Sequence, residues 1–202
     1  MRHYRAGMTG AARDRVGAVV LGGGRSTRFG SDKLAADVGG TPLLRHAVDA
    51  VLPLAGQVVV VGTPAAPLPA GVLVVADSQE YAGPYAAVRD GVAALALGID
   101  TVLVLAGDLL DPAPLLPLLL AALDADDPDH LPEAAVAVDA EGRRQPLLAA
   151  YRVEPLVAGM AGVDAYHRAA YALLDGLHVV EVLDQTAGAA ATRDVDTPDD
   201  LP

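Results

Sequence analysis

The sequence contains no cysteine among its 202 residues. A disulfide scaffold and a metal site built from thiolates are therefore both excluded. The chain also lacks a long hydrophobic run, because its densest apolar stretch, Leu115 to Leu123, is short and contains Pro117. A membrane-spanning helix needs ~18 consecutive apolar residues. We therefore predict no membrane segment, and we expect the protein to reside in the cytoplasm.

Positive charge is scarce as well. The chain carries 14 Lys and Arg residues against 26 Asp and Glu residues, which gives a formal net charge of −12 at pH 7. This balance argues against broad nucleic-acid binding and against attraction to anionic membranes. The overall field would oppose a polyphosphate ligand, so local cations and a divalent metal would have to overcome that field at the site.

The length and the apolar content, 52% of the residues, suit a single domain with one well-buried core. We expect this domain to cover residues 16–202. Residues 1–15 are rich in Arg and small residues, without the apolar block and cleavage site of a secretory signal. We expect them to form a disordered extension.

Apolar, β-branched runs alternate with helix-like segments along the chain. A helix is expected to begin with Thr41 as N-cap and Pro42 as its first helical residue. The predicted strands are 16–21, 57–61, 72–76, 101–106, 134–138, 145–151 and 178–183, and the predicted helices are 41–52, 85–97, 112–123 and 165–174. This alternation is typical of a Rossmann-like, doubly wound α/β fold, with a mostly parallel sheet and helices on both faces.

Ligands of such sheets bind beyond the carboxyl ends of the strands. Three segments should then share one edge: the loop after Leu21, Asp77 and Asp108. The loop after Leu21 begins with three glycines, Gly22 to Gly24, whose backbone N–H groups can surround an anion. Arg25, Arg28 and Lys33 follow as cations, so the stretch contains the parts of a polyphosphate site.

Two common phosphate loops do not match this stretch. The dinucleotide pattern G-x-G-x-x-G fails because Thr27 stands where the third glycine should be. The Walker pattern fails because Gly30 is followed by Ser31 and Asp32 instead of Lys and Ser or Thr.

Residues 21–33 read LGGGRSTRFGSDK and fit the pattern L-x-G-G-x-S-x-R-[MF]-G-x-D-K. This stretch resembles the signature loop of the molybdenum cofactor guanylyltransferases, the MobA family of nucleotidyltransferases. The resemblance extends over residues 16–201 and implies a GT-A-like nucleotidyltransferase fold. It also implies transfer of GMP from GTP to the phosphate of molybdopterin, which forms the guanine dinucleotide cofactor and releases pyrophosphate. Molybdoenzymes or their chaperones are then the expected protein partners, and we expect a monomer.

The resemblance assigns roles to particular residues. Asp108 matches the strand-end aspartate that binds Mg²⁺ and nucleotide, and Asp77 matches an earlier strand-end aspartate that contacts the nucleotide. Leu21, Gly22 and Gly23 match the positions that recognise guanine.

Nucleotidyl transfer needs reactants held in place and phosphate charge neutralised, without a covalent bond to the protein. We expect the glycine amides of Gly22 to Gly24 to donate hydrogen bonds, Lys33 to supply a cation and Arg28 to contact the leaving pyrophosphate. Asp108 is the expected Mg²⁺ ligand, because Mg²⁺ takes few protein carboxylates together with phosphates and waters.

The sequence also departs from the family pattern. Val61 or Gly62 stands at the position of a nucleotide-contacting asparagine, and Gly107 replaces a cysteine. Asp194 and Asp196 replace asparagines, and we expect Asp196 to be a second metal ligand or its neighbour. A cytidylyl- or sugar-phosphate nucleotidyltransferase of the same fold stays an alternative, as does a non-catalytic nucleotide- or cofactor-binding module.

Overall fold

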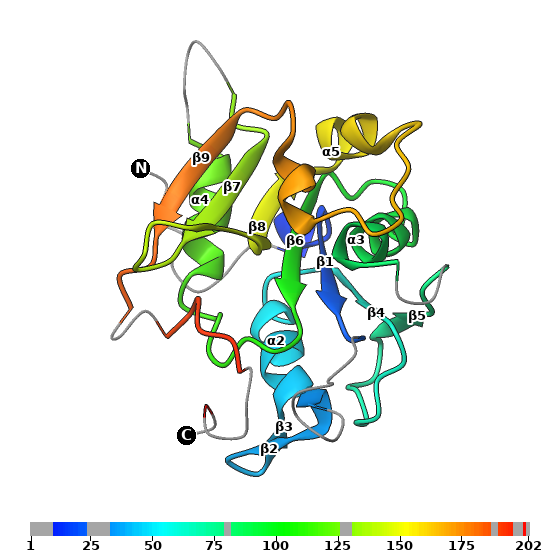
Figure 1. Ribbon diagram of the computed structural model, residues 1–202, viewed down its shortest axis with the longest axis vertical. Helices are drawn as coiled ribbons and strands as arrows, with labels where there is room; N and C mark the ends of the chain where they lie inside the picture. The colour runs from blue at the N-terminus through cyan, green and yellow to red at the C-terminus, as the bar shows by residue number, and fades with distance from the viewer. Residues whose placement is uncertain are drawn as a thin grey trace.

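The computed structural model describes residues 10–23, 33–78, 82–125, 131–186, 190–195 and 200. Their centre is a seven-stranded sheet in the order β5-β4-β1-β6-β8-β7-β9 (Figure 1). The strands are β1 (Val16–Leu21), β4 (Gln57–Val61), β5 (Leu73–Val75), β6 (Thr101–Ala106), β7 (Ala134–Val138), β8 (Arg144–Arg152) and β9 (Val179–Leu183). Only β8 in this sheet runs antiparallel to its neighbours β6 and β7. The predicted mostly parallel α/β sheet is thereby confirmed.

Helices cover both faces of the sheet (Figure 1). One face packs against α2 (Leu43–Val51) and α4 (Leu116–Leu123), and the other packs against α3 (Pro84–Ala93), α5 (Val153–Met160) and the 3₁₀ helix η2 (Ala170–Leu174). Strand side chains alternate between the two cores, so Val20 and Val60 point to the first while Val19 and Val59 point to the second. Burial on both faces explains the uninterrupted apolar runs of the parallel strands.

Three elements differ from the sequence expectation. Thr41 is not an N-cap, because Thr41–Pro42 form strand β3, which pairs with β2 (Asp37–Val38). Helix α2 begins at Leu43, with Pro42 in the cap position and an extended ψ of 141°. The helix predicted at residues 165–174 shortens to η2, and α5 follows β8 without having been predicted. Pro155 lies in the first turn of α5, where its missing N–H costs little.

Residues 10–15 also differ from the expected disordered extension. Residues Gly10–Arg13 form α1, and Nε of Arg13 donates to the carbonyl of Ala55 at 3.0 Å. Nη2 of Arg13 donates to the carbonyl of Leu52, also at 3.0 Å. These bonds tie the segment to the end of α2, and residues 1–9 lie outside the described part of the chain. Within that part, no helix has the length and apolar character required to cross a membrane.

Three parallel strands end side by side, and a glycine follows each of them. Leu21 pairs with Val61 and with Ala106, so Gly22, Gly62 and Gly107 are neighbours at the carboxyl edge of the sheet. A Cβ on Gly62 would lie 2.6 Å from the nitrogen of Gly23, and one on Gly107 would lie 2.4 Å from the carbonyl oxygen of Leu21. Gly62 also has a φ of 122°. The backbones at this edge therefore pack without room for side chains.

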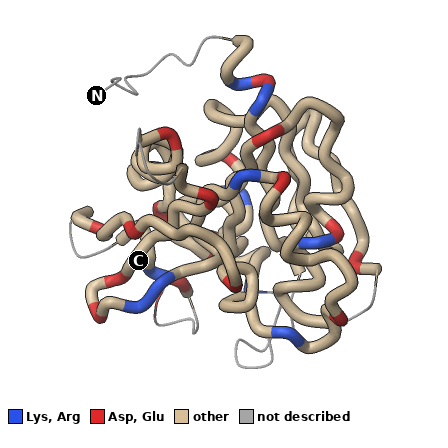
Figure 2. The backbone as a smooth tube through the Cα atoms, turned by 90° about the horizontal axis from the view of Figure 1, so that it is seen from above, with Lys and Arg blue, Asp and Glu red and all other residues tan. Residues whose placement is uncertain are grey.

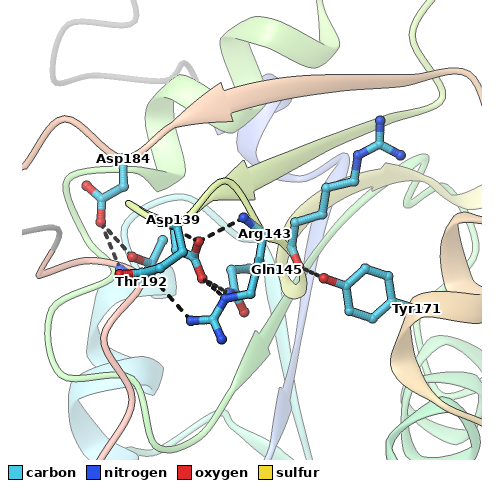
Figure 3. A network of polar contacts seen from close by, with 8 residues as sticks. Asp139, Arg143, Gln145, Tyr171, Asp184 and Thr192 are labelled. Atoms are coloured by element: carbon cyan, nitrogen blue, oxygen red, sulfur yellow. Dashed lines mark hydrogen bonds and ion pairs between the residues drawn. The ribbon is translucent and has the colours of Figure 1, made fainter.

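The turn between β7 and β8 is held by one carboxylate, that of Asp139 (Figure 3). Its Oδ1 accepts from the backbone nitrogens of Glu141 and Arg143, at 3.0 and 2.8 Å. Its Oδ2 accepts from Nε of Arg143 at 2.9 Å and from Nε2 of Gln145 at 2.8 Å. Burial works to raise the pKa of Asp139, but the hydrogen bonds from Arg143 and Gln145 prevail and lower it.

We expect Gly62→Ala to lower the free energy of unfolding by about 2–5 kcal/mol, because the new Cβ adds a steric clash to backbone strain. Gly71→Ala is the matched control. Gly71 has a φ of 88° but open space around a Cβ, so this variant should lose only about 1 kcal/mol. Urea denaturation measures both values. Equal losses in the two variants would contradict the close approach of Gly62 to Gly23.

Asp139→Asn should lower the free energy of unfolding at pH 7 by about 1.5–3 kcal/mol, since hydrogen bonds to a charged group are lost. Because the pKa of Asp139 is lowered in the folded state, its contribution is complete above the ordinary value of 3.8 and disappears as the pH falls through the lowered pKa. The difference from the unmodified protein should therefore shrink on acidification. Urea denaturation between pH 7 and pH 3 tests this, with the exposed Glu141→Gln as control.

Candidate active site

The carboxyl edge of the parallel strands brings distant parts of the sequence together. The β1 end, Leu21, lies between the ends of β4 and β6, and the N–H of Gly62 donates to the carbonyl of Val75 at 2.8 Å. The segment 21–23, Asp77 and Asp108 thus follow neighbouring strands at one edge. This is the arrangement in which doubly wound sheets bind ligands.

The central contact of this edge is an ion pair between Lys33 and Asp108. Nζ of Lys33 lies 2.9 Å from Oδ2 of Asp108, and the two side chains are 12% and 26% exposed. Lys33 begins the 3₁₀ helix η1 (Lys33–Ala35), which packs against α2, whereas Asp108 lies two residues after the end of β6. The pair therefore joins the end of the glycine-containing stretch to the end of a central strand.

Lys33 is the only lysine in the sequence, since the other thirteen of its 14 basic residues are arginines. Lysine carries a compact point charge that suits a phosphate oxygen, whereas arginine presents a planar fork. The residue count alone reveals this single lysine, whereas its position beside Asp108 is seen in the structure. Acidic and basic positions are interspersed along the described backbone (Figure 2).

The glycine amides of the loop do not all remain available to a ligand. The N–H of Gly22 donates to the carbonyl of Val61 at 2.7 Å, which continues the ladder between β1 and β4. The predicted use of this amide as a phosphate donor is therefore corrected, because the sheet already engages it. Gly23 is the next described residue, whereas Gly24, Arg28 and Asp196 lie outside the described residues.

Asp77 lies against the glycine stretch. Its Oδ2 is 3.5 Å from the position that a Cβ on Gly23 would take. Partial burial, followed by the charge of nearby Asp90, raises the pKa of Asp77 above its ordinary value. Asp90, on α3, accepts a hydrogen bond from the backbone nitrogen of Ser78 at 2.8 Å. Asp77 can therefore accept donors from a ligand that lies along Gly23.

A later segment of the chain, the return segment (residues 190–195), reaches the loop that carries Asp108. The N–H of Leu110 donates to the carbonyl of Arg193, and the N–H of Val195 donates to the carbonyl of Asp108, both at 3.2 Å. Leu109 and Asp194 form an isolated antiparallel bridge. The family pattern places Asp194 and Asp196 near the proposed metal, but the backbone pairing of this segment with the Asp108 loop was not predicted.

Both arginines of the β7–β8 turn are bound to carboxylates. Nε of Arg143 contacts Asp139, and Nε of Arg144 donates to Oε1 of Glu181 at 2.7 Å. Tyr171 donates its hydroxyl to the carbonyl of Arg144 at 2.7 Å (Figure 3). Because β8 runs antiparallel to β6, this turn lies at the same end of the sheet as Asp108.

The residues of this edge suit Mg²⁺ bound together with a phosphate ligand. The described residues contain no group of three or more His, Asp or Glu side chains that could hold a metal by themselves. Mg²⁺ commonly uses one or two carboxylates and completes its shell with phosphate oxygens and waters. Asp108 supplies one such carboxylate at the exit of a buried strand.

Comparison with known proteins identifies the family of this chain. The family model described as the MobA-like NTP transferase domain matches residues 18–181. The probable molybdenum cofactor guanylyltransferase of Chloroflexus aggregans is 34% identical over 203 residues, which cover 91% of this chain and 90% of the relative. The molybdenum cofactor guanylyltransferase of Cupriavidus pinatubonensis is 32% identical over 196 residues, which cover 94% of this chain and 96% of the relative.

A solved structure shares the fold. The crystal structure of the Mycobacterium tuberculosis rv0371c homolog from Mycobacterium sp. strain JC1 has a TM-score of 0.72 at 20% identity, and the match covers 93% of each chain. The family model and the two relatives extend over most of the chain, including the strands that end at the Lys33–Asp108 pair. The chain therefore belongs to the MobA-like NTP transferase family and is a nucleotidyltransferase.

Proposed function

We propose that this protein transfers GMP from GTP to the phosphate of molybdopterin, forming the guanine dinucleotide cofactor and releasing pyrophosphate. The observation that carries the proposal is the Lys33–Asp108 pair beside the glycine stretch, at the edge where such sheets bind nucleotides. The names of both relatives, molybdenum cofactor guanylyltransferases, support the choice of donor and acceptor.

In this reaction an oxygen of the acceptor phosphate forms a bond to the α-phosphorus of GTP. The bond between the α-phosphorus and the oxygen that bridges the α- and β-phosphates breaks, and its electron pair leaves with pyrophosphate. Lys33 neutralises charge on the phosphate oxygens, and Gly23 and Gly24 keep their predicted role as amide donors to the triphosphate. Arg28 keeps its predicted role at the leaving pyrophosphate, and Asp196 keeps its predicted place near the metal.

Asp108 would hold Mg²⁺, with Asp196 as the second candidate ligand. When bound, the ion supplies charge neutralisation on the triphosphate. The ammonium of Lys33, 2.9 Å from Asp108, holds this carboxylate on the side of the glycine stretch. The role of both side chains is thus to orient the triphosphate and to balance its charge.

Asp77 is the proposed acceptor of hydrogen bonds from the nucleotide, and Leu21, Gly22 and Gly23 keep their predicted place in the nucleotide-binding site. Guanine presents two neighbouring N–H donor groups that a carboxylate can accept with both oxygens, whereas cytosine presents one amino group. Gly62 contributes no side chain at this edge, and a Cβ there would meet Gly23. The cytidylyl alternative therefore predicts a preference for CTP over GTP at this site.

Molybdopterin is the proposed acceptor, and a molybdoenzyme or its chaperone is the proposed recipient of the product. A monomer and residence in the cytoplasm stay predictions.

Pyrophosphate release from GTP, with Mg²⁺ and molybdopterin present, measures the activity. We expect Lys33→Ala and Asp108→Ala each to lower kcat by about 10²–10³-fold, because each removes charge stabilisation from the transition state. Arg45→Ala and Asp49→Ala are matched controls, since these residues form an exposed ion pair on α2 at 3.0 Å. Full activity in both site variants would contradict the proposed site. Faster turnover of CTP than of GTP would contradict the proposed preference for guanine.

The single lysine also permits a binding test that does not depend on turnover. An amine-reactive acylating reagent can modify only Lys33 and the amino terminus of the chain. We expect GTP with Mg²⁺, at ten times its Kd, to slow acylation of Lys33 by about tenfold through occupancy. The amino terminus is the internal control, and mass spectrometry reads both sites. Equal acylation rates with and without nucleotide, or stronger protection by CTP, would overturn the assignment.

A further inference from the structure

The return segment (residues 190–195) connects the two sides of the active site. Its residues Arg193 and Val195 form backbone hydrogen bonds with Leu110 and Asp108, at 3.2 Å each. Val195 is fully buried and packs with Val38 and Leu43. Val38 and Leu43 lie in the segment that follows Lys33, so the return segment contacts both the loop of Asp108 and the region behind Lys33.

One carboxylate binds the return segment, that of Asp184 (Figure 3). Its Oδ2 accepts from the backbone nitrogen and from the hydroxyl of Thr192, both at 3.0 Å. Its Oδ1 accepts from the backbone nitrogen of Thr186 at 2.9 Å and from the hydroxyl of Thr186 at 2.5 Å. The hydroxyl of Thr186 in turn accepts from the backbone nitrogen of Ala191 at 3.3 Å.

Asp184 is itself fixed to the sheet. Asp184 directly follows β9, and its backbone nitrogen donates to the carbonyl of Val138 at 3.0 Å. Ala191 is fully buried in the core beneath α2 and α4. Burial works to raise the pKa of Asp184, but the hydrogen bonds from Thr186 and Thr192 prevail and lower it. The ionised carboxylate of Asp184 therefore accepts hydrogen bonds from both Thr186 and Thr192.

We propose that Asp184 is a positioning residue, which holds the return segment against the loop of Asp108 and thereby fixes the Asp108 carboxylate opposite Lys33. Asp184 acts through Thr192 and the backbone bonds of residues 193–195, and it touches no reacting group. Hydrogen bonds to an ionised carboxylate are stronger than neutral ones, so loss of the charge should loosen the segment. Its effect on catalysis rests on the proposed function of Asp108, whereas its effect on the return segment does not.

The test compares Asp184→Asn with Thr192→Val, which removes one hydroxyl, and with Thr192→Ser, which keeps it. Asp164→Asn is the matched control, because Asp164 accepts a bond from the nitrogen of Tyr166 in an exposed turn at 3.0 Å. We expect Asp184→Asn and Thr192→Val to lower kcat about tenfold, with KM for GTP changed by less than about twofold. Thr192→Ser should stay within about twofold of the unmodified protein, as should Asp164→Asn.

Hydrogen exchange gives a readout that is independent of catalysis. The amides of Leu110 and Val195 should exchange about tenfold faster in Asp184→Asn than in the unmodified protein, because both depend on the return segment. If exchange at both amides stays unchanged in Asp184→Asn, the proposal is overturned, even when the protein shows no guanylyl transfer at all. Faster exchange with an unaltered kcat would equally overturn it. If Asp184→Asn does not fold, Thr192→Val against Thr192→Ser decides by the same measurements.

Discussion

The candidate active site at the carboxyl edge of the sheet depends on the ion pair between Lys33 and Asp108. The two residues come from different parts of the sequence, one after the glycine stretch and one at the end of β6. In a chain with a net charge of −12, their contact places the ammonium of the only lysine next to a carboxylate near the end of a strand. Partial burial of both side chains makes this pair less screened than an exposed one. The packing of η1 on α2, the end of β6 and the return segment all serve to keep these two groups in contact.

Much of the parallel part of the sheet and its carboxyl edge could be predicted from the sequence, for a physical reason. The parallel strands are buried on both faces, so their uninterrupted β-branched runs are visible without any knowledge of partners. The rule that ligands bind beyond the carboxyl ends of such strands then brings Leu21, Asp77 and Asp108 to one edge. Lys33 follows from the motif that begins at Leu21. Their functional roles are supported by the family and stay predictions.

The rest could not be predicted, because it depends on contacts that leave little trace in local sequence. The engagement of the Gly22 amide by Val61 follows from the register of two strands. In the sequence Asp139 and Asp184 resemble ordinary loop carboxylates, and only the structure shows the hydrogen bonds that they accept. Thr41 and Pro42 have the composition of a helix start, yet pairing with Val38 makes them a strand. In each case a tertiary partner outweighs the local preference.

The reversed direction of β8 has a consequence for how the protein can diversify. Strands β5, β4, β1 and β6 end at the edge that carries Asp77 and Asp108, whereas β8 begins at that same edge and presents a turn instead. A turn tolerates insertions and replacements more readily than a strand end within a ladder. One half of the edge can therefore be remodelled while the other half keeps its geometry. A common donor can then be combined with different acceptors on a single scaffold.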